Sequence, residues 1–410
     1  MERRIFNERT GGNGAIMRQD TLRSSKHTAM QTPGRFSASN LLTILILGIF
    51  LTLHPSTLHS QESLQRKASV AEGRKSFKIL KQLPITSIKN QWRSGTCWAY
   101  GTLGFLESEI LRKTGRQYDL CEMFVVNKDY ADNAEYYVRM HGYSQISEGG
   151  SCDDVMEVIR RHGICPEDAM PTPGSLVGDS LANFTKFFPV FEQTVRRMVD
   201  KSAAAPAPHW RDTVQNVLDM NLGACPVTFR ADGVTYTPQE YARSLGIVPD
   251  DYVSLTSYTH HPFNAWCIIE ALYKWRPKPS YNIPVWELMQ VIDRAIDKGY
   301  TVGWGGDCTG GFTRSGLAEL PDGEVPTQDA RQEQWDDWRF TYDHVMLIYG
   351  KAEDTLGRQY YMVKNTWGKY GDYDGIWYMS RDYMAMNTTY IYLNRHALPG
   401  KLRKATKRML

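Results

Sequence analysis

The sequence predicts an α+β fold, with helices leading and strands following along the chain. Apolar residues recur at helical spacing before residues 203–208, the only low-complexity stretch, whereas short runs rich in β-branched and aromatic residues follow residue 299. With 42% hydrophobic residues among 410, the chain can bury a substantial core. This length fits two or three domains, or one large two-lobed unit.

Three segments carry the apolar periodicity of an amphipathic helix, and a glycine, a common helix terminator, follows each. They are residues 97–112, 153–162 and 286–298, followed by Gly115, Gly163 and Gly299. The second segment begins with two aspartates, whose charge suits the N-terminal end of a helix dipole.

Five strands are expected in the C-terminal part of the chain. The runs are short, contain β-branched and aromatic residues, and are separated by turn-forming residues. They cover residues 300–304, 345–350, 360–363, 375–379 and 389–393.

An apolar run of 13 residues, 41–53, precedes the body of the protein. It is too short to span a bilayer comfortably but suits the apolar region of a secretory signal, and Ser60 offers a small residue near a cleavage point. We therefore expect residues 1–60 to be a leader with a signal peptide, and the body to be periplasmic or extracellular, without a stable membrane anchor after processing. A single transmembrane anchor or a buried helix is the alternative.

The net charge of +3 is unevenly distributed. It divides into +4 for residues 1–40, +6 for residues 395–410 and −7 for the residues between them. A nucleic-acid-binding protein normally carries its basic surplus on the folded domain, so nucleic acid is not expected as a partner. Residues 395–410 form a basic C-terminal arm, after a body that covers residues 61–394.

Seven cysteines are scattered without a C-x-x-C pair or the cysteine and histidine spacing of a zinc site. We therefore expect no metal and no cofactor. Export would permit disulfides, and an odd count leaves at least one thiol unpaired. A set of buried free thiols is the alternative.

One segment combines a thiol with a helix start. Residues 91–100 read Gln-Trp-Arg-Ser-Gly-Thr-Cys-Trp-Ala-Tyr, which places Cys97 in the first turn of the first predicted helix. There the helix dipole favours a thiolate, and the unpaired N–H group of Cys97 can bind an oxyanion. The side-chain amide of Gln91 can supply a second donor. Since most cysteines near a helix start are structural, this segment alone does not decide the function.

The C-terminal half supplies possible partners for this thiol. His344 begins an apolar strand, and Asn365 ends the next strand, two residues before Trp367. A nucleophilic cysteine needs a base and a third group that orients the base. His344 and Asn365 can take these roles if the two strands are neighbours. An isolated histidine at a strand end is usually structural, but cysteine, histidine and asparagine in this order indicate a catalytic triad.

The motifs S-G-T-C-W, D-H-V-M-L-I-Y-G and V-K-N-T-W-G resemble those of the papain-like cysteine peptidases, over about residues 80–395. The chain is most similar to the bleomycin hydrolase and aminopeptidase C branch. Ser94 stands where papain and the cathepsins have a disulfide-forming cysteine, and the long interval between Cys97 and His344 fits the insertions of that branch. Residues 300–307 also resemble its late strand-and-aspartate motif, although residues 308–310 depart from it.

The resemblance implies a two-lobed papain-like fold with the active-site cleft between the lobes. We expect a helical lobe over roughly residues 80–220 and an antiparallel sheet or barrel lobe over roughly residues 221–394.

The resemblance also implies roles for individual residues. Cys97 is the nucleophile, His344 holds the thiolate as imidazolium and protonates the leaving amine, and Asn365 orients His344. Gln91 and the Cys97 N–H group stabilise the oxyanion. The remaining residues form the substrate-binding surface: Gly149 and Gly150, which let a substrate backbone approach closely, with Trp98, Asp343 and Trp367.

In the bleomycin hydrolase branch a C-terminal arm lies in the cleft, and its terminal carboxylate pairs with the free amine of the substrate. Here an arm exists, but residues 401–408 are basic and would repel an ammonium group unless the carboxylate of Leu410 dominates. A solvated tail is the alternative.

Two other features have competing explanations. His260 and His261 suggest a metal site, but no carboxylate stands at ligand spacing, so an ordered loop is the preferred interpretation. A set of aromatic residues suggests either a carbohydrate platform or, as we prefer, core and lobe interface: Trp266, Tyr273, Trp275, Tyr281 and Trp286.

The sequence thus predicts an exported cysteine peptidase that cleaves peptides near a free N-terminus and that could form homo-oligomers. The alternatives are an endopeptidase with an open cleft and a peptide-binding module of the same fold without turnover.

Overall fold

The structure is a computed structural model that describes residues 74–170, 176–177, 181–199, 206 and 208–407. The chain divides into two units, residues 1–72 and 73–410. The expected leader and its signal peptide lie outside the described residues. Within the described residues, no helix is long and apolar enough to cross a membrane.

The helical lobe is built around α2 (Cys97–Thr114), whose first fourteen residues are all buried. Its helices share one hydrophobic core. Against α2 pack α3 (Glu122–Arg139) and α4 (Cys152–His162). Behind them, α5 (Phe187–Arg197) and α6 (Trp210–Leu222) pack against α3, and α7 (Pro238–Ser244) packs against α4. Short elements complete this lobe: η1 (Glu167–Ala169), β2 (Leu176–Val177), β3 (Leu181–Ala182), β4 (Phe229–Ala231) and β5 (Val234–Tyr236).

The sheet lobe contains one ten-stranded sheet with the order β10-β13-β12-β11-β9-β14-β6-β8-β7, and β1 pairs with β11. The N-terminal strands are β1 (Phe77–Gln82), β6 (Tyr252–Thr256), β7 (Ala265–Cys267) and β8 (Ser280–Asn282). The later strands are β9 (Val302–Gly306), β10 (Leu317–Ala318), β11 (His344–Asp354), β12 (Gln359–Lys364), β13 (Ile376–Ser380) and β14 (Thr388–Asn394). Helices of this lobe are η2 (Pro249–Asp251), α8 (Val285–Asp297), α9 (Gln328–Asp336), α10 (Arg381–Asn387), η3 (Arg395–Ala397) and α11 (Gly400–Ala405).

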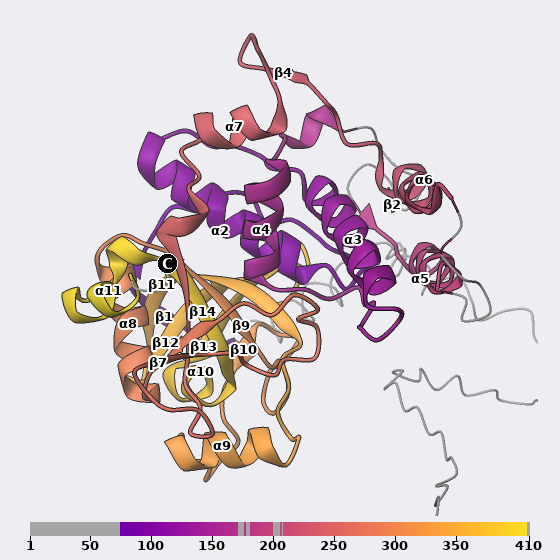
Figure 1. Cartoon of the computed structure of the whole chain (residues 1–410). Helices are drawn as coiled ribbons and strands as arrows, with labels where there is room; N and C mark the ends of the chain where they lie inside the picture. Colours follow the sequence, from indigo (N-terminus) through magenta and orange to yellow (C-terminus); the bar gives the residue numbers. More distant parts are fainter. Residues whose placement is uncertain (1–73, 171–175, 178–180, 200–205, 207, 408–410) are drawn as a thin grey trace, which may run out of the picture. The chain divides into compact units, whose positions relative to one another are not determined.

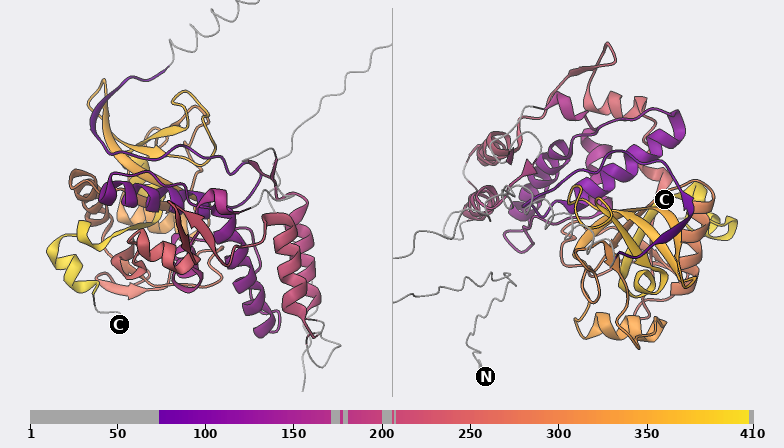
Figure 2. Two further views of the ribbon diagram at one scale, coloured as in Figure 1. Left: turned by 90° about the horizontal axis from the view of Figure 1, so that it is seen from above. Right: turned by 180° about the vertical axis from the view of Figure 1, so that it is seen from behind.

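The two lobes lie side by side, with the indigo-to-magenta helices on one side and the orange-to-yellow sheet on the other (Figures 1 and 2). This α+β arrangement is the predicted fold class. All three predicted helices and five predicted strands are present within two residues of their expected bounds, except that β11 extends four residues beyond its expected end at residue 350. The sheet is mixed rather than antiparallel, because β6 pairs with β8 and β10 with β13 in parallel.

The boundary between the lobes lies later than the expected residue 221. Phe229 and Tyr241, from β4 and α7, pack into the core of the helical lobe, and the large sheet resumes only at β6. Conversely β1, close to the start of the described chain, belongs to the sheet lobe.

A close crossing of α2 and β11 joins the two lobes. A Cβ atom on Gly101 would lie 2.8 Å from the main-chain oxygen of Val345, so only glycine allows this approach. Since Cys97 begins α2 and His344 begins β11, the crossing brings the two residues to the same end of the contact.

The C-terminal arm is folded against the sheet lobe as far as Lys407. Leu398 and Leu402 are buried in its hydrophobic core. Arg395 donates to the main-chain oxygens of Tyr252 and Thr406, which fixes the arm to β6. Residues 395–407 are therefore neither a frayed tail nor an arm inside the cleft.

Candidate active site

A tight turn before α2 presents the thiol of Cys97. Within it, Ser94 Oγ donates to Gln91 O at 2.7 Å, and Gly95 N donates to Glu148 Oε2 at 2.6 Å. Cys97 is the first residue of α2, so its N–H group has no acceptor inside the helix. The thiol and this N–H group are therefore available on the same side of the helix start.

His344 and Asn365 are joined by a hydrogen bond. His344 Nε2 lies 2.8 Å from Asn365 Oδ1, which also accepts from the N–H group of Thr366 at 2.7 Å. Strands β11 and β12 are neighbours, as the short connection between them requires. The ring centroid of Trp367 lies 5.0 Å from that of His344, which shields the imidazole from one side.

Burial controls the protonation of the thiol and the imidazole. It raises the pKa of Cys97 to about 12, although main-chain hydrogen bonds from Val345 and Trp98 oppose the shift. It lowers the pKa of His344 to about 4, although the hydrogen bond with Asn365 opposes it. Both shifts favour an uncharged thiol beside an uncharged imidazole. Loss of solvent thus acts against the dipole of α2, which favours a thiolate.

The side-chain amide of Gln91 is fixed at both ends. Its Oε1 accepts from Thr366 Oγ1, and its Nε2 donates to Ser94 O at 2.7 Å. Because a primary amide nitrogen carries two N–H groups, one donor of Nε2 is left beside Cys97.

A cavity of about 600 Å³ joins most of the predicted site residues. Gln91, Cys97, Gly149, Gly150, Asp343, His344 and Trp367 all line it. Asn365 lies behind His344 and is fully buried. The prediction that Trp98 contacts substrate is wrong in this geometry: its side chain is 0% exposed and its Nε1 donates to Glu148 O at 2.9 Å. As the next residue on α2, Trp98 is rotated about 100° from Cys97 toward the core.

The wall formed by Glu148, Gly149 and Gly150 is less open than the glycine pair suggests. A Cβ atom on Gly149 would lie 2.7 Å from Cγ of Tyr273, and one on Gly150 would lie 2.8 Å from the ring of Trp98. Both glycines therefore accommodate aromatic side chains of the protein itself, rather than leaving space for substrate on these faces.

Asp343 contacts Cys97 and a second cysteine, Cys308. Its Oδ1 accepts from the N–H group of Cys308 at 3.0 Å, and its main-chain oxygen lies 3.9 Å from Cys97 Sγ. Burial and the nearby carboxylate of Asp307 raise the pKa of Asp343 to about 7. All seven cysteines are free thiols.

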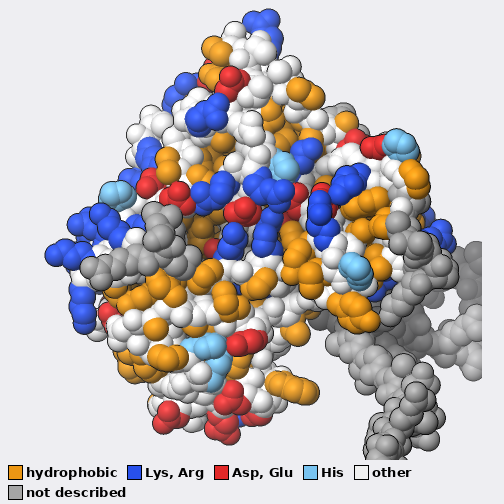
Figure 3. All heavy atoms as spheres, viewed as in Figure 1, with side chains coloured by type: hydrophobic (Ala, Val, Ile, Leu, Met, Phe, Trp, Pro, Cys, Tyr) orange, Lys and Arg blue, Asp and Glu red, His pale blue; other side chains and the backbone are white. Residues whose placement is uncertain are grey.

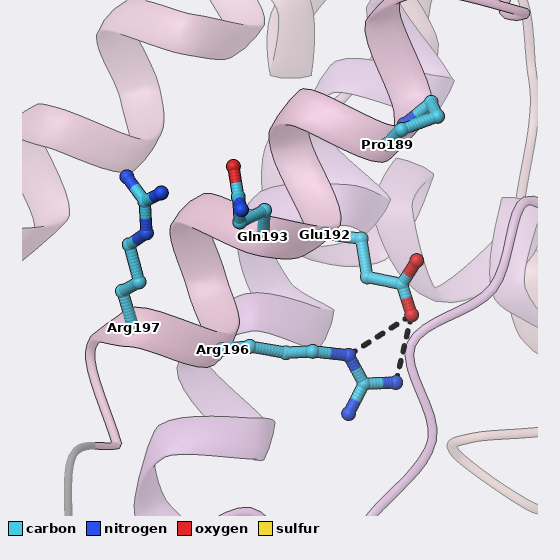
Figure 4. Close-up of a pocket in the computed structure, with 5 residues that line it drawn as sticks. All are labelled: Pro189, Glu192, Gln193, Arg196 and Arg197. Carbon is cyan, nitrogen blue, oxygen red and sulfur yellow. Dashed lines mark hydrogen bonds and ion pairs between the residues drawn. The ribbon is translucent and has the colours of Figure 1, made fainter.

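Two further carboxylates line the cavity, Glu148 and Glu192. Glu192 of α5 accepts two hydrogen bonds from Arg196, which the close-up of the adjacent cavity of about 750 Å³ shows (Figure 4). Burial raises the pKa of Glu148, and the N–H group of Gly95 opposes this shift. Within the described part of the chain, no lysine or arginine lowers the pKa of Glu148.

The histidine pair outside the cavity does have a carboxylate, which sequence spacing did not reveal. His260 Nε2 and His261 Nε2 each lie 3.2 Å from an oxygen of Glu270. Gln332 accepts from Thr259 N through Oε1, so its Nε2, at 2.8 Å, donates to His260 Nδ1. The proton of neutral His260 then lies on Nε2 and points at Glu270. A metal bound to Nε2 of His260 would require the ring proton to lie on Nδ1. There it would face the N–H donor of Gln332 Nε2, so the group is better explained as a hydrogen-bonded cluster.

A family model described as the peptidase C1-like family matches residues 55–409. The chain belongs to the peptidase C1-like family. This membership confirms the papain-like cysteine peptidase resemblance, in its bleomycin hydrolase and aminopeptidase C branch, that the motifs around Cys97, His344 and Asn365 indicated.

Curated relatives and a solved structure agree with this assignment. Procathepsin L of Felis catus is 26% identical over 163 residues, which is 38% of this chain and 43% of that protein. A cathepsin L-like protein of Caenorhabditis elegans is 35% identical over 91 residues, 22% of this chain and 24% of that protein. The chain thus spans less than half the length of these relatives. The crystal structure of PepW from Lactobacillus rhamnosis HN001 has a TM-score of 0.64 at 17% identity, covering 87% of this chain and 92% of that one, and shares the fold.

Several residues of the cavity were not predicted from the sequence, among them Tyr273, Tyr342 and Glu192. The sequence assigns Tyr273 to a set of aromatic residues in the core and lobe interface, and it indicates no role for Tyr342 or Glu192. Tyr342 stands two positions before His344, and this proximity was the one available signal. Glu192 and Tyr273 come from segments whose distance to Cys97 in the fold no local pattern shows.

Proposed function

We propose that this protein is a cysteine peptidase that uses Cys97, His344 and Asn365 as its catalytic triad. The observation that carries the proposal is the 2.8 Å contact between His344 Nε2 and Asn365 Oδ1, in a pair whose imidazole shares a cavity with Cys97. With Nε2 turned to Asn365, the other ring nitrogen, Nδ1, is the one free to exchange a proton with the thiol.

The proposed reaction begins from the uncharged pair. Sγ of Cys97 attacks the scissile carbonyl carbon while Nδ1 of His344 takes the thiol proton. The N–H group of Cys97 and Nε2 of Gln91 hold the resulting oxyanion. His344 then returns the proton to the leaving amine, and the C–N bond breaks. Water, deprotonated by His344, hydrolyses the thioester and restores the thiol.

We further propose that the enzyme acts as an aminopeptidase. Glu148 is the cavity carboxylate best suited to bind a substrate ammonium group, because Arg196 already pairs with Glu192, and the carboxylate of Asp307 adds to burial in raising the pKa of Asp343. Burial also raises the pKa of Glu148, but there the N–H group of Gly95 opposes the shift. Glu148 also contacts Gly95, two residues before the nucleophile, so a group bound to it lies next to the scissile bond. Among the described residues of the C-terminal arm, 395–407, none lines the cavity, so we assign this role to Glu148.

A substitution of the nucleophile tests the chemistry. Cys97→Ala is expected to lower kcat/KM on an aminoacyl reporter by at least about a thousandfold, since triad members act as a unit. Cys267→Ala, which removes a buried thiol outside the cavity, is the matched control and should keep activity within about twofold. Wild-type rates in Cys97→Ala would disprove the triad and favour a peptide-binding module.

A comparison of free and N-acetylated peptides separates the two kinds of peptidase. An aminopeptidase prefers the free amine, whereas equal rates on both would favour an endopeptidase with an open cleft.

We also propose that the body is exported and that residues 1–60 are removed. N-terminal sequencing of the secreted protein tests this, and recovery of the full chain from the cytoplasm would contradict it.

A further inference from the structure

One aromatic side chain lies against the wall on which a substrate would be expected to rest. Tyr273 belongs to residues 268–279, which connect β7 to β8, and it lines the same cavity as Cys97. Its Cγ and Cβ would lie 2.7 and 2.8 Å from a Cβ atom on Gly149. The space that a glycine leaves beside the cleft is therefore filled by Tyr273.

Buried contacts on the C-terminal side of Tyr273 fix it in this place. Lys274 Nζ lies 3.6 Å from Asp153 Oδ2, and Arg276 Nη2 lies 3.2 Å from Asp129 Oδ1. The Nε1 group of Trp275 also donates to Asp129 at 3.1 Å. Since the acidic partners belong to α3 and α4, the segment is attached to the helical lobe next to Tyr273, and the main chain that carries the ring cannot move away without breaking buried ion pairs.

A second tyrosine crosses the cleft at the neighbouring glycine. Tyr342 precedes β11 in the sheet lobe, and its hydroxyl donates to the main-chain oxygen of Gly150 in the helical lobe at 2.6 Å. Tyr342 is buried and lines the cavity. The bond therefore connects the two walls and uses an acceptor that an extended substrate would otherwise need.

The chemistry fixes which end of a substrate meets this barrier. His344 must donate a proton to the leaving amine, so the part of the substrate beyond the scissile bond lies on the His344 side. The part before the scissile bond then extends along Glu148, Gly149 and Gly150, toward Tyr273 and Tyr342.

We propose that Tyr273, backed by the bond between Tyr342 and Gly150, closes the cleft on the N-terminal side of the scissile bond and restricts that side to a single substrate residue. Tyr273 is then the residue that determines exopeptidase specificity, and the preferred substrates are peptides with a free N-terminal residue. This inference rests on the proposed aminopeptidase function but assigns its cause to a loop rather than to the chain terminus.

The kinetic test compares an aminoacyl reporter with an N-acetyl-dipeptidyl reporter that has the same leaving group. Tyr273→Ala should raise kcat/KM on the blocked reporter at least about tenfold relative to wild type and change that on the free reporter by less than about fivefold. Tyr273→Phe keeps the ring and should behave as wild type. Tyr143→Ala, an exposed tyrosine outside the cavity lining, is the control.

Two outcomes would overturn the inference. One is an unchanged ratio of blocked to free rates in a folded Tyr273→Ala protein. The other is a wild-type enzyme that already cleaves the blocked reporter as well as the free one.

A binding experiment keeps the inference testable if the proposed chemistry fails. In a Cys97→Ala background, Tyr273→Ala should tighten the Kd for a fluorescent N-acetyl-tripeptide at least about tenfold, while Tyr273→Phe should not. Equal affinities in all three proteins would overturn the closure of the cleft. Loss of hydrolysis by the wild type together with this change in Kd would instead overturn only the proposed catalytic function.

Discussion

At the scale of single residues, we expect the buried His344 to determine the pH range of the proposed reaction. Burial lowers its pKa to about 4, so the imidazole stays neutral, and able to accept the thiol proton, down to about that pH. We expect kcat/KM to be lost as the pH falls through about 4, measured over pH 3–8 at constant ionic strength. An acidic limb near 6.5, the value of a solvated imidazole, would contradict a desolvated base in the free enzyme.

Also at the scale of single residues, we expect the cavity carboxylates Glu148 and Glu192 to contribute differently to substrate binding. Glu148→Gln keeps an acceptor for the N–H group of Gly95 but removes the charge, so we expect kcat/KM on a free aminoacyl reporter to fall about 10- to 100-fold, chiefly through KM. The rate on an N-acetylated reporter should not fall. Glu192→Gln is the control, and a larger loss there than in Glu148→Gln would assign the ammonium group to Glu192 instead.

At the scale of elements, the crossing of α2 over β11 positions Cys97 and His344 of the proposed triad. Gly101→Ala would place a methyl group 2.8 Å from the main-chain oxygen of Val345, so we expect a loss of about 1–3 kcal/mol of unfolding free energy and reduced kcat. Gly104→Ala meets only the flexible end of Lys364 at 3.3 Å and should be neutral or mildly stabilising. Urea unfolding of both variants measures the difference; equal stabilities would argue against a tight crossing.

Elements were predictable where one clear face is buried. The segments that became α4 and α8 show regular apolar periodicity and end at a glycine, so their bounds were found within one residue. In contrast α3 buries polar residues among its apolar ones, including Asn127 and Asp129, which obscures the periodicity, and it was not predicted. The residues of the proposed triad could be selected from the sequence because they stand at strand and helix ends with recognisable neighbours.

At the scale of the whole molecule, contacts between distant segments could not be predicted from the sequence. Tyr273 meets Gly149 and Tyr342 meets Gly150 across intervals of more than a hundred residues, which no local spacing indicates. Charge is distributed in the same non-local way: lysines and arginines gather across the middle of one face, between the helices and the sheet, interspersed with acidic side chains (Figure 3). The net charges of segments therefore indicate little about the folded surface.

Also at the scale of the whole molecule, we expect buried and exposed residues of the C-terminal arm to contribute differently to stability. Leu402 of α11 is 2% exposed in the core of the sheet lobe, so Leu402→Ala should cost about 2–5 kcal/mol of unfolding free energy, whereas the exposed Lys401→Ala should change it by less than about 0.5 kcal/mol.

Because no residue of 395–407 lines the cavity, a chain shortened after Pro399 should be less stable yet keep the ratio of free to N-acetylated rates within about twofold, measured well below its lowered Tm. If shortening instead allowed blocked peptides to be cleaved, the arm would reach the cleft and take the role that we assign to Tyr273. Unchanged selectivity in the shortened chain, combined with a changed ratio in Tyr273→Ala, would locate exopeptidase specificity in the loop between β7 and β8.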